Sequence, residues 1–204
     1  DAAVAGMLLA GVVQAVSSGL GGGGFAIYYE ASSKRTTVID FRETAPAGLT
    51  KGSINRLARA RRGTLVGAPG ELAGLADVHR RWGKRPFSEL FEAAISAAEG
   101  GFEVSAHVRR TAKVTLPLVA ESKLAKSIVE PLGTSSRSRN PALAAALRQI
   151  RREGIAALYG GSLGQQVVNA AQSAGGALTL DDLARYRVVE RPHLEIAYGG
   201  HRIL

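Results

Sequence analysis

Two short segments near the start of the chain hold the residue types that could bind a small anion. One follows Ser17 and Ser18 and is a run of four consecutive glycines, Gly21, Gly22, Gly23 and Gly24. Such a run lets the backbone approach a ligand closely and adopt positive φ angles. The other is Arg42, followed by Glu43. A guanidinium binds a carboxylate through two parallel charge-assisted hydrogen bonds. The two segments together predict a carboxylate site.

The elements around these segments are predicted to bring them together. Residues 25–30 and 36–41 are rich in β-branched and aromatic side chains, and a short polar stretch separates them. This pattern predicts a β-hairpin that returns the chain from the glycine run to Arg42. Both alternations of the hairpin are apolar, which predicts a sheet covered on both faces. Residues 1–16 are apolar nearly all round and predict a buried helix.

The rest of the chain is predicted to be mostly helical. Apolar spacing and terminal glycines predict helices over residues 71–82, 86–98, 105–119, 142–153, 155–159, 162–174 and 180–186. Asn140 is the predicted N-cap of the helix at 142–153, and Thr179 is that of the helix at 180–186, with Asp182 in its first turn. We expect a basic, exposed segment at 51–62, a mobile polar linker at 133–140, and an edge strand pair at 188–204. The strands are too few for a complete sheet. The chain is therefore predicted to be part of a layered α/β sandwich whose remaining strands come from elsewhere.

Composition narrows the classes of function. The chain has 204 residues, a net charge of +9 and no cysteine, which excludes disulfides and thiolate zinc sites. The basic residues fall on several predicted helices without interleaved aromatics, so we expect solvated helix faces and no nucleic-acid partner. The glycine run precedes a strand, whereas a dinucleotide-binding loop opens a helix. We predict no cofactor, no metal site and no stable membrane insertion of this segment, and composition leaves the compartment open.

The same motifs resemble the γ-glutamyltransferase family. The likeness lies in the serines with their glycine run and in Asp-Phe-Arg-Glu-Thr-Ala-Pro at 40–46. Residues 65–75 are similar to that family's Val-Gly-x-Pro-Gly turn and the helix after it, and residues 93–102 and 178–186 are similar too. The resemblance covers nearly the whole chain.

The resemblance implies an N-terminal nucleophile hydrolase with a four-layer αββα sandwich, cut from one precursor into a large and a small subunit. Residues 1–204 would be a single domain and most of the large subunit. The nucleophile would be the N-terminal threonine of the small subunit, so no residue of this chain is expected to be catalytic. The resemblance also implies export to the periplasm or the extracellular space.

The resemblance assigns Arg42 to the α-carboxylate of the γ-glutamyl donor. Glu43 could orient Arg42, receive the substrate ammonium, or be a surface carboxylate at a strand end. Ser17, Ser18 and the glycine run are expected to shape the loop that supports the site.

Two other readings stay open at this point. A sibling acylase or amidase of the same fold would act on a polyglutamate or an acylated drug, and Arg42 favours a donor with an α-carboxylate over these. A non-catalytic homologue would bind a ligand but lack a usable threonine in its partner.

Overall fold

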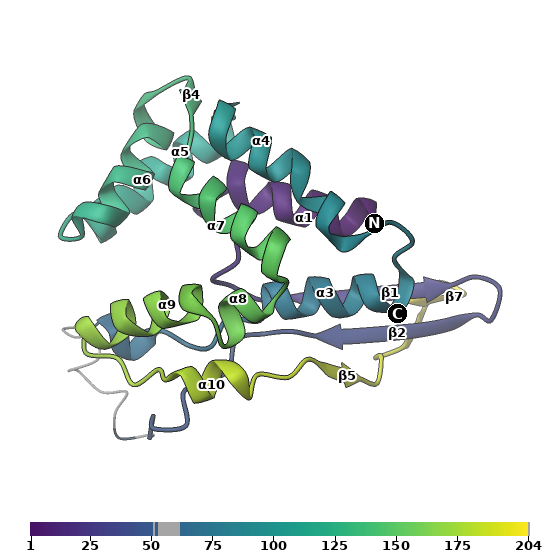
Figure 1. The fold of residues 1–204 in the computed structure, drawn as a ribbon. Helices are drawn as coiled ribbons and strands as arrows, with labels where there is room; N and C mark the ends of the chain where they lie inside the picture. Colours follow the sequence, from purple (N-terminus) through teal and green to yellow (C-terminus); the bar gives the residue numbers. More distant parts are fainter. Residues whose placement is uncertain (51, 53–61, 204) are drawn as a thin grey trace. The chain divides into compact units, whose positions relative to one another are not determined.

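The structure is a computed structural model that describes residues 1–50, 52 and 62–203 (Figure 1). The chain divides into two compact units. Unit 1 comprises Asp1–Leu20 and Gly83–Ala157, and unit 2 comprises Gly21–Trp82 and Leu158–Leu204. One domain over the whole chain stays a prediction. Apart from Gly52 and Arg62, the predicted basic segment lies outside the described residues.

Unit 1 is built mainly from helices. They are α1 (Ala2–Val13), η3 (Phe87–Phe91), α4 (Glu92–Gly100), α5 (Ala106–Thr115), η4 (Leu116–Val119), α6 (Lys123–Thr134) and α7 (Pro141–Glu153). Helix α1 contacts η3 and α4, α4 contacts α7, and α5 contacts α6. The first predicted helix is confirmed, but in the described chain it buries one stripe, formed by Val4, Leu8 and Val12, while Met7 is 40% exposed.

The predicted mobile linker at 133–140 is wrong. Its first two residues end helix α6, and β4 (Arg137–Ser138) pairs antiparallel with β3 (Phe102–Glu103). Backbone pairing with the segment after α4 orders this stretch in spite of its polar composition, because strand hydrogen bonds need no apolar side chains. The predicted cap of the next helix is confirmed, since the Asn140 side chain accepts a hydrogen bond from the Leu143 amide at 3.0 Å.

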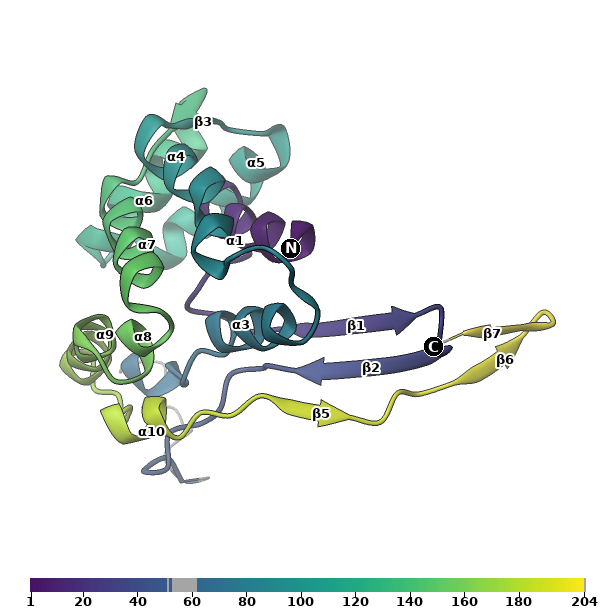
Figure 2. The same cartoon turned by 45° about the vertical axis from the view of Figure 1, so that its right-hand side comes forward.

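Unit 2 holds a three-stranded antiparallel sheet in the order β1 (Phe25–Glu30), β2 (Arg35–Asp40) and β5 (Val189–Arg191). The predicted hairpin is confirmed as β1 and β2. Helix α3 (Glu71–Trp82) lies along one face of these strands (Figure 2). On that face the Tyr28 ring stacks on Trp82 with centroids 4.1 Å apart.

The opposite face of the sheet carries large apolar side chains that the described chain leaves uncovered. Phe25, Ile27 and Tyr29 alternate along β1 and are 61%, 62% and 53% exposed, and Val189 on β5 is 43% exposed. The sequence predicts that both faces of the sheet are covered. Among the described residues, only the face toward α3 is covered.

The remaining described helices of unit 2 are η2 (Arg62–Leu65), α9 (Ser162–Ser173) and α10 (Leu180–Ala184), while α8 (Ala156–Tyr159) begins in unit 1 and ends in unit 2. Residues of α9, of α10 and of the segments beside them form a buried core that comprises Ala68, Val168, Ala171, Leu178, Leu183 and Tyr186. The hairpin of β6 (Ile196–Tyr198) and β7 (His201–Ile203) is exposed along both strands and takes no part in this core. Helix α10 begins at the predicted cap, Thr179, which forms a capping box with Asp182.

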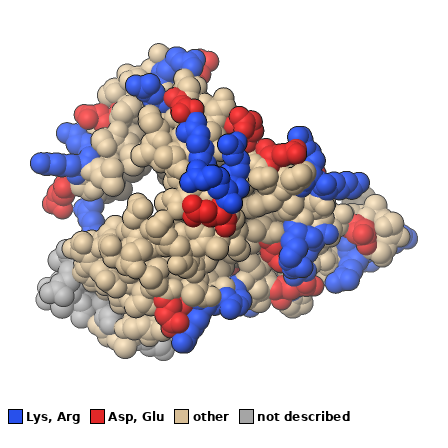
Figure 3. Space-filling view, viewed as in Figure 1, with Lys and Arg blue, Asp and Glu red and all other residues tan. Residues whose placement is uncertain are grey.

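The charged residues do not gather on one described element. On the face drawn in Figure 3, Lys and Arg alternate with Asp and Glu. Among the described residues, no helix is both long and apolar enough to span a bilayer.

Candidate functional site

The glycine run lies beside Arg42 because the hairpin continues past its assigned strands. Gly24 and Phe41 exchange backbone hydrogen bonds, with the Gly24 amide 3.3 Å from the Phe41 carbonyl and the Phe41 amide 2.9 Å from the Gly24 carbonyl. A Cβ on Gly23 would lie 2.3 Å from the Phe41 carbonyl oxygen, closer than real Cβ contacts. Only glycine therefore permits this approach, and the juxtaposition expected from the sequence is present in the structure.

The conformational reason for the glycines differs from the expected one. None of the four has a positive φ; the positive angle falls on Gly19 instead, at +154°. A Cβ on Gly21 would meet nothing within 4 Å, whereas one on Gly24 would lie 3.1 Å from the Phe41 ring. Close packing against the Phe41 segment, rather than a left-handed backbone, requires glycine at 23 and favours it at 24.

The Arg42 side chain is 54% exposed, and its guanidinium has two protein partners. Its Nη1 donates to the Gly23 carbonyl at 3.1 Å, and its Nη2 lies 3.0 Å from Oε2 of Glu43. Because a guanidinium carries more N–H groups than these two contacts use, it keeps donors for a ligand. Glu43 thus forms an ion pair with Arg42, and its role at the site stays a prediction.

Asp40 fixes the backbone at the end of β2. One carboxylate oxygen accepts from the Arg42 amide at 2.9 Å, and the other accepts from Nε of Arg191 at 2.8 Å. The hydrogen bond from the Arg42 amide, followed by that from Arg191, lowers the pKa of Asp40 below its ordinary value of 3.8. The carboxylate is therefore ionised at neutral pH.

Segments far apart in the sequence meet at this point. The Gly22 carbonyl accepts hydrogen bonds from the amides of Gly70 and Glu71, both at 2.9 Å, at the start of α3. Thr44 and Ala68 form an antiparallel bridge. These contacts join the glycine run, the Arg-Glu-Thr-Ala-Pro segment and the Pro-Gly turn.

The segment after α9 also reaches this place. Asp182 accepts from the Ala47 amide at 2.8 Å, and the Tyr186 hydroxyl donates to the Arg42 carbonyl at 2.9 Å. Sequence reasoning placed Asp182 in the first turn of a helix and assigned neither residue a role at the site. The only signal was that residues 178–186 belong to a stretch with a family likeness.

Ser17 and Ser18 belong to unit 1, whereas Arg42 belongs to unit 2. Both serine amides donate to the Gln14 carbonyl, at 2.8 and 3.0 Å, and the Ser17 hydroxyl donates to the same oxygen at 3.3 Å. The serines thus close the turn after α1. Their support of the donor site stays a prediction.

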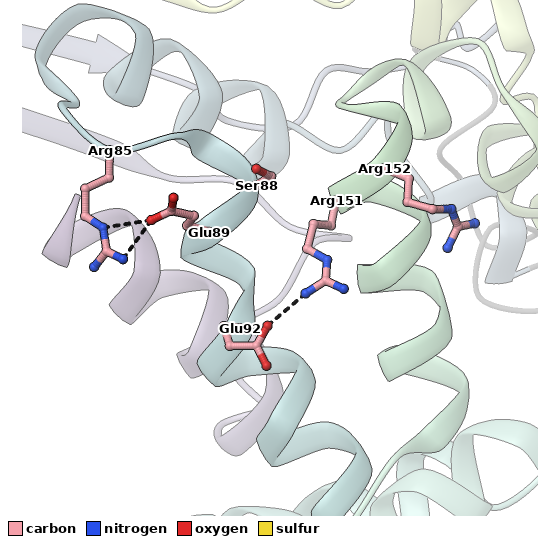
Figure 4. Close-up of a pocket in the computed structure, with 6 residues that line it drawn as sticks. All are labelled: Arg85, Ser88, Glu89, Glu92, Arg151 and Arg152. Carbon is pink, nitrogen blue, oxygen red and sulfur yellow. Dashed lines mark hydrogen bonds and ion pairs between the residues drawn. The ribbon is translucent and has the colours of Figure 1, made fainter.

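A separate hollow of about 530 Å³ lies in unit 1 (Figure 4). Its lining residues are Arg85, Ser88, Glu89, Glu92, Arg151 and Arg152. Arg85 pairs with Glu89 at 2.7 Å and Arg151 with Glu92 at 2.8 Å, while Arg152 points away from both pairs in Figure 4. Two of its three arginines are thus matched to carboxylates of the same hollow. No group of three or more His, Cys, Asp or Glu in the described ranges is placed to hold a metal ion.

The family model and the curated relatives that match this chain agree with one another. A family model described as Gamma-glutamyltranspeptidase matches residues 1–204. Glutathione hydrolase 3 of Arabidopsis thaliana is 37% identical over all of this chain and 33% of its own length. Glutathione hydrolase 5 proenzyme of Rattus norvegicus is 35% identical over all of this chain and 37% of its own length. The chain thus spans about a third of these curated relatives.

Solved structures share the fold. The γ-glutamyltranspeptidase from Pseudomonas nitroreducens complexed with L-DON superposes with a TM-score of 0.91 and 27% identity, over 99% of this chain and 62% of that one. The enzyme from Helicobacter pylori gives a TM-score of 0.89 at 27% identity, over 99% of this chain and 61% of that one. The predicted fold class, the mixed α/β fold of N-terminal nucleophile hydrolases, is confirmed. The chain belongs to the γ-glutamyltranspeptidase family.

Proposed function

We propose that the full-length protein is a processed γ-glutamyltransferase that acts as a glutathione hydrolase, and that this chain supplies most of its large subunit. The observation that carries this proposal is the mounting of Arg42. Its guanidinium is held between the Gly23 carbonyl and Glu43, is half exposed, and lies where the motif segments of unit 2 meet. The glutathione hydrolase names of its relatives support the same activity.

The reaction divides between two subunits. The N-terminal threonine of the small subunit attacks the γ-carbonyl carbon of the donor, and its own α-amine takes the hydroxyl proton. The amide C–N bond then breaks, the amine leaves with a proton, and a γ-glutamyl ester remains on the threonine. Water hydrolyses this ester, or an acceptor amine takes up the γ-glutamyl group. No step requires a cofactor.

Arg42 binds and orients the donor. Its free N–H groups form the fork that matches the donor's α-carboxylate, which fixes the distance from that carboxylate to the γ-carbonyl. Glu43 keeps the guanidinium in place through the 3.0 Å contact. Because lysine has no planar fork, an arginine is required for this geometry.

The small subunit covers the exposed face of the unit 2 sheet. Phe25, Ile27 and Tyr29 form an apolar stripe on the side of β1 opposite α3. A contiguous apolar sheet face is costly in water and is typical of an interface. A second sheet packed on this stripe would produce the αββα layers that the family likeness implies.

The two alternative functions make different demands on Arg42 and on the small subunit. A sibling acylase that acts on an acylated drug would not need a fork for an α-carboxylate, so the contacts that hold Arg42 favour the γ-glutamyl donor over that substrate. A non-catalytic homologue would have the same large subunit but a small subunit without a usable threonine. We also propose export, as the family resemblance implies, and cell fractionation of the full-length protein tests it.

The first experiment uses the full-length protein. We expect two bands from one precursor on a denaturing gel, a threonine as the first residue of the smaller band, and release of p-nitroaniline from γ-glutamyl-p-nitroanilide. A smaller band that begins with another residue would exclude the threonine mechanism. Turnover of an acylated drug in preference to the γ-glutamyl donor would favour the sibling acylase.

The second experiment tests the partner surface. Ile27→Lys places a charge on the apolar stripe, and we expect loss of the two-subunit complex in size-exclusion chromatography. Val114→Lys is the matched control, because Val114 is 70% exposed on α5 and outside that stripe. Equal recovery of the complex from both variants would contradict the proposed interface.

A further inference from the structure

Tyr186 holds the main chain of Arg42 from 144 residues away. Its hydroxyl donates to the Arg42 carbonyl at 2.9 Å. The Arg42 amide is used by Asp40 at 2.9 Å. Strand β2 ends at Asp40, and among the described residues neither the Arg42 amide nor the Arg42 carbonyl forms a backbone–backbone hydrogen bond. Side chains take over this task, and Tyr186 does so for the carbonyl.

Packing fixes the place of the Tyr186 hydroxyl. The residue is 7% exposed, and its ring stacks on Tyr159 with centroids 5.8 Å apart and an interplanar angle of 22°. A Cβ on Gly70 would lie 2.2 Å from the hydroxyl oxygen, so only glycine there leaves room for it. Burial raises the pKa of Tyr186 to about 12, which keeps the hydroxyl a proton donor at neutral pH.

The hydroxyl of the neighbouring Tyr159 has other hydrogen-bond partners. The Tyr159 hydroxyl donates to the Pro69 carbonyl at 2.8 Å and accepts from the Ala73 amide at 3.1 Å, and no contact of that hydroxyl with Arg42 is present. The two tyrosines therefore place two hydroxyls in one ring stack, and only the Tyr186 hydroxyl contacts Arg42. A comparison of the two residues can distinguish a role in positioning Arg42 from a general contribution to stability.

We infer that Tyr186 is a positioning residue for the donor site, which fixes the Arg42 guanidinium so that the enzyme discriminates donors by their α-carboxylate. The inference rests on the proposed function. Without the hydroxyl, the Arg42 carbonyl loses its partner and the peptide group after Arg42 can rotate. The side chain then leaves its alignment with the Gly23 carbonyl, and the fork no longer matches the carboxylate.

The test compares two donors in the full-length, processed enzyme. One is γ-glutamyl-p-nitroanilide, and the other is 4-aminobutyryl-p-nitroanilide, which lacks the α-carboxylate. For Tyr186→Phe we expect kcat/KM for the first donor to fall by about 3- to 10-fold, mainly through KM, as loss of one hydrogen bond predicts. The second donor should be unaffected, because Arg42 has no carboxylate to hold.

Tyr159→Phe is the matched control. It removes a buried hydroxyl from the same stack and should lower the Tm, but it should leave the ratio of kcat/KM for the two donors unchanged. Equal losses for both donors in Tyr186→Phe, or the same change of ratio in Tyr159→Phe, would overturn the inference in favour of a structural role.

Arg42→Ala separates failure of the inference from failure of the proposed function. If Arg42→Ala retains the donor ratio, the function assigned to Arg42 is wrong. If Arg42→Ala loses the ratio and Tyr186→Phe keeps it, only the inference is wrong. In the Arg42→Ala background, Tyr186→Phe should not change the ratio further, since two residues that act through one contact are not additive.

A crystal structure of Tyr186→Phe gives a readout that does not depend on turnover. A displaced Arg42 carbonyl and guanidinium would show that Tyr186 positions Arg42, even if the proposed function of the enzyme is wrong. An Arg42 in its original position overturns the inference.

Discussion

Arginines occur in two different settings in this chain. In the hollow of unit 1, Arg85 lies in the bend before η3 and Arg151 lies on α7, and they pair with Glu89 and Glu92, whose side chains are 47% and 73% exposed. In unit 2, Arg42 follows a strand, and both its main-chain groups and its guanidinium have partners. The hollow has more arginines, with three among its lining residues. The Arg42 segment has more contacts that determine where one guanidinium lies.

This difference shows why charge alone is a poor guide to a site. Exposed ion pairs contribute about 0–1 kcal/mol because water screens them and long side chains lose entropy. Around Arg42, glycines at 23, 70 and 74 allow backbone and rings to approach so closely that a Cβ on any of them would overlap the Phe41 residue. These contacts fix the backbone that carries Arg42. A guanidinium that is to bind a carboxylate in one orientation needs such a fixed backbone.

The largest expected effect comes from filling the gap between the glycine run and Phe41. Gly23→Val should lower kcat/KM for γ-glutamyl-p-nitroanilide by about 100-fold or more, because a displacement of about 1 Å can cost that much. It should also destabilise the protein by about 1–3 kcal/mol through overpacking. Gly21→Val is the control, as a Cβ there meets nothing within 4 Å. Equal activity of the two variants would make the run a passive connector.

The next largest effect is expected from removal of the Arg42 guanidinium. Arg42→Ala should lower kcat/KM by about 30-fold or more, since loss of one partner of a desolvated charge pair costs about 2–5 kcal/mol. Arg42→Lys should be nearly as poor because an ammonium forms no fork. Arg151→Ala removes an arginine of the hollow and should stay within about threefold of wild type, as its exposed ion pair contributes little. If Arg42→Ala also stayed within about threefold, the two settings would not differ in function.

The smallest effect concerns pH. The pKa of Asp40 is lowered in the folded protein, so its contribution to stability is present above the unfolded value, near 3.8, and is lost as the pH falls through the folded value. Asp40→Asn should therefore lower the Tm at pH 7 and narrow its difference from wild type below about pH 4. Thermal melts between pH 7 and pH 2 measure this. Glu92→Gln in the hollow is the control and should change the Tm little at pH 7. A constant Tm difference for Asp40→Asn across the range would contradict the assignment.

Local sequence signals predicted the elements near the site well. β-Branched and aromatic residues on either side of a polar stretch predicted the β1–β2 hairpin, and Pro69-Gly70 followed by an apolar period predicted α3. Thr179 and Asp182 formed the expected cap of α10. These features depend on residues a few positions apart, so periodicity and turn chemistry are enough to find them.

Two expectations failed because the deciding partner is distant. The polar stretch at 133–140 read as a mobile linker, but β3 supplies a strand partner for Arg137 and Ser138. The glycines at 23 and 24 read as sites for positive φ, but the Phe41 segment beside them requires small residues. Composition predicts the behaviour of an isolated segment. In both cases the conformation was instead determined by a neighbouring segment of backbone.

The sequence by itself determined that Arg42 follows a hairpin, that a glycine run precedes it, and that the chain resembles one family. Only the tertiary structure decided how Arg42 is held. Tyr186 reaches its carbonyl across 144 residues, and the Gly22 carbonyl binds the amides at the start of α3. Such contacts form because buried polar groups need partners wherever the packed core places them, and no local pattern encodes which distant group that will be.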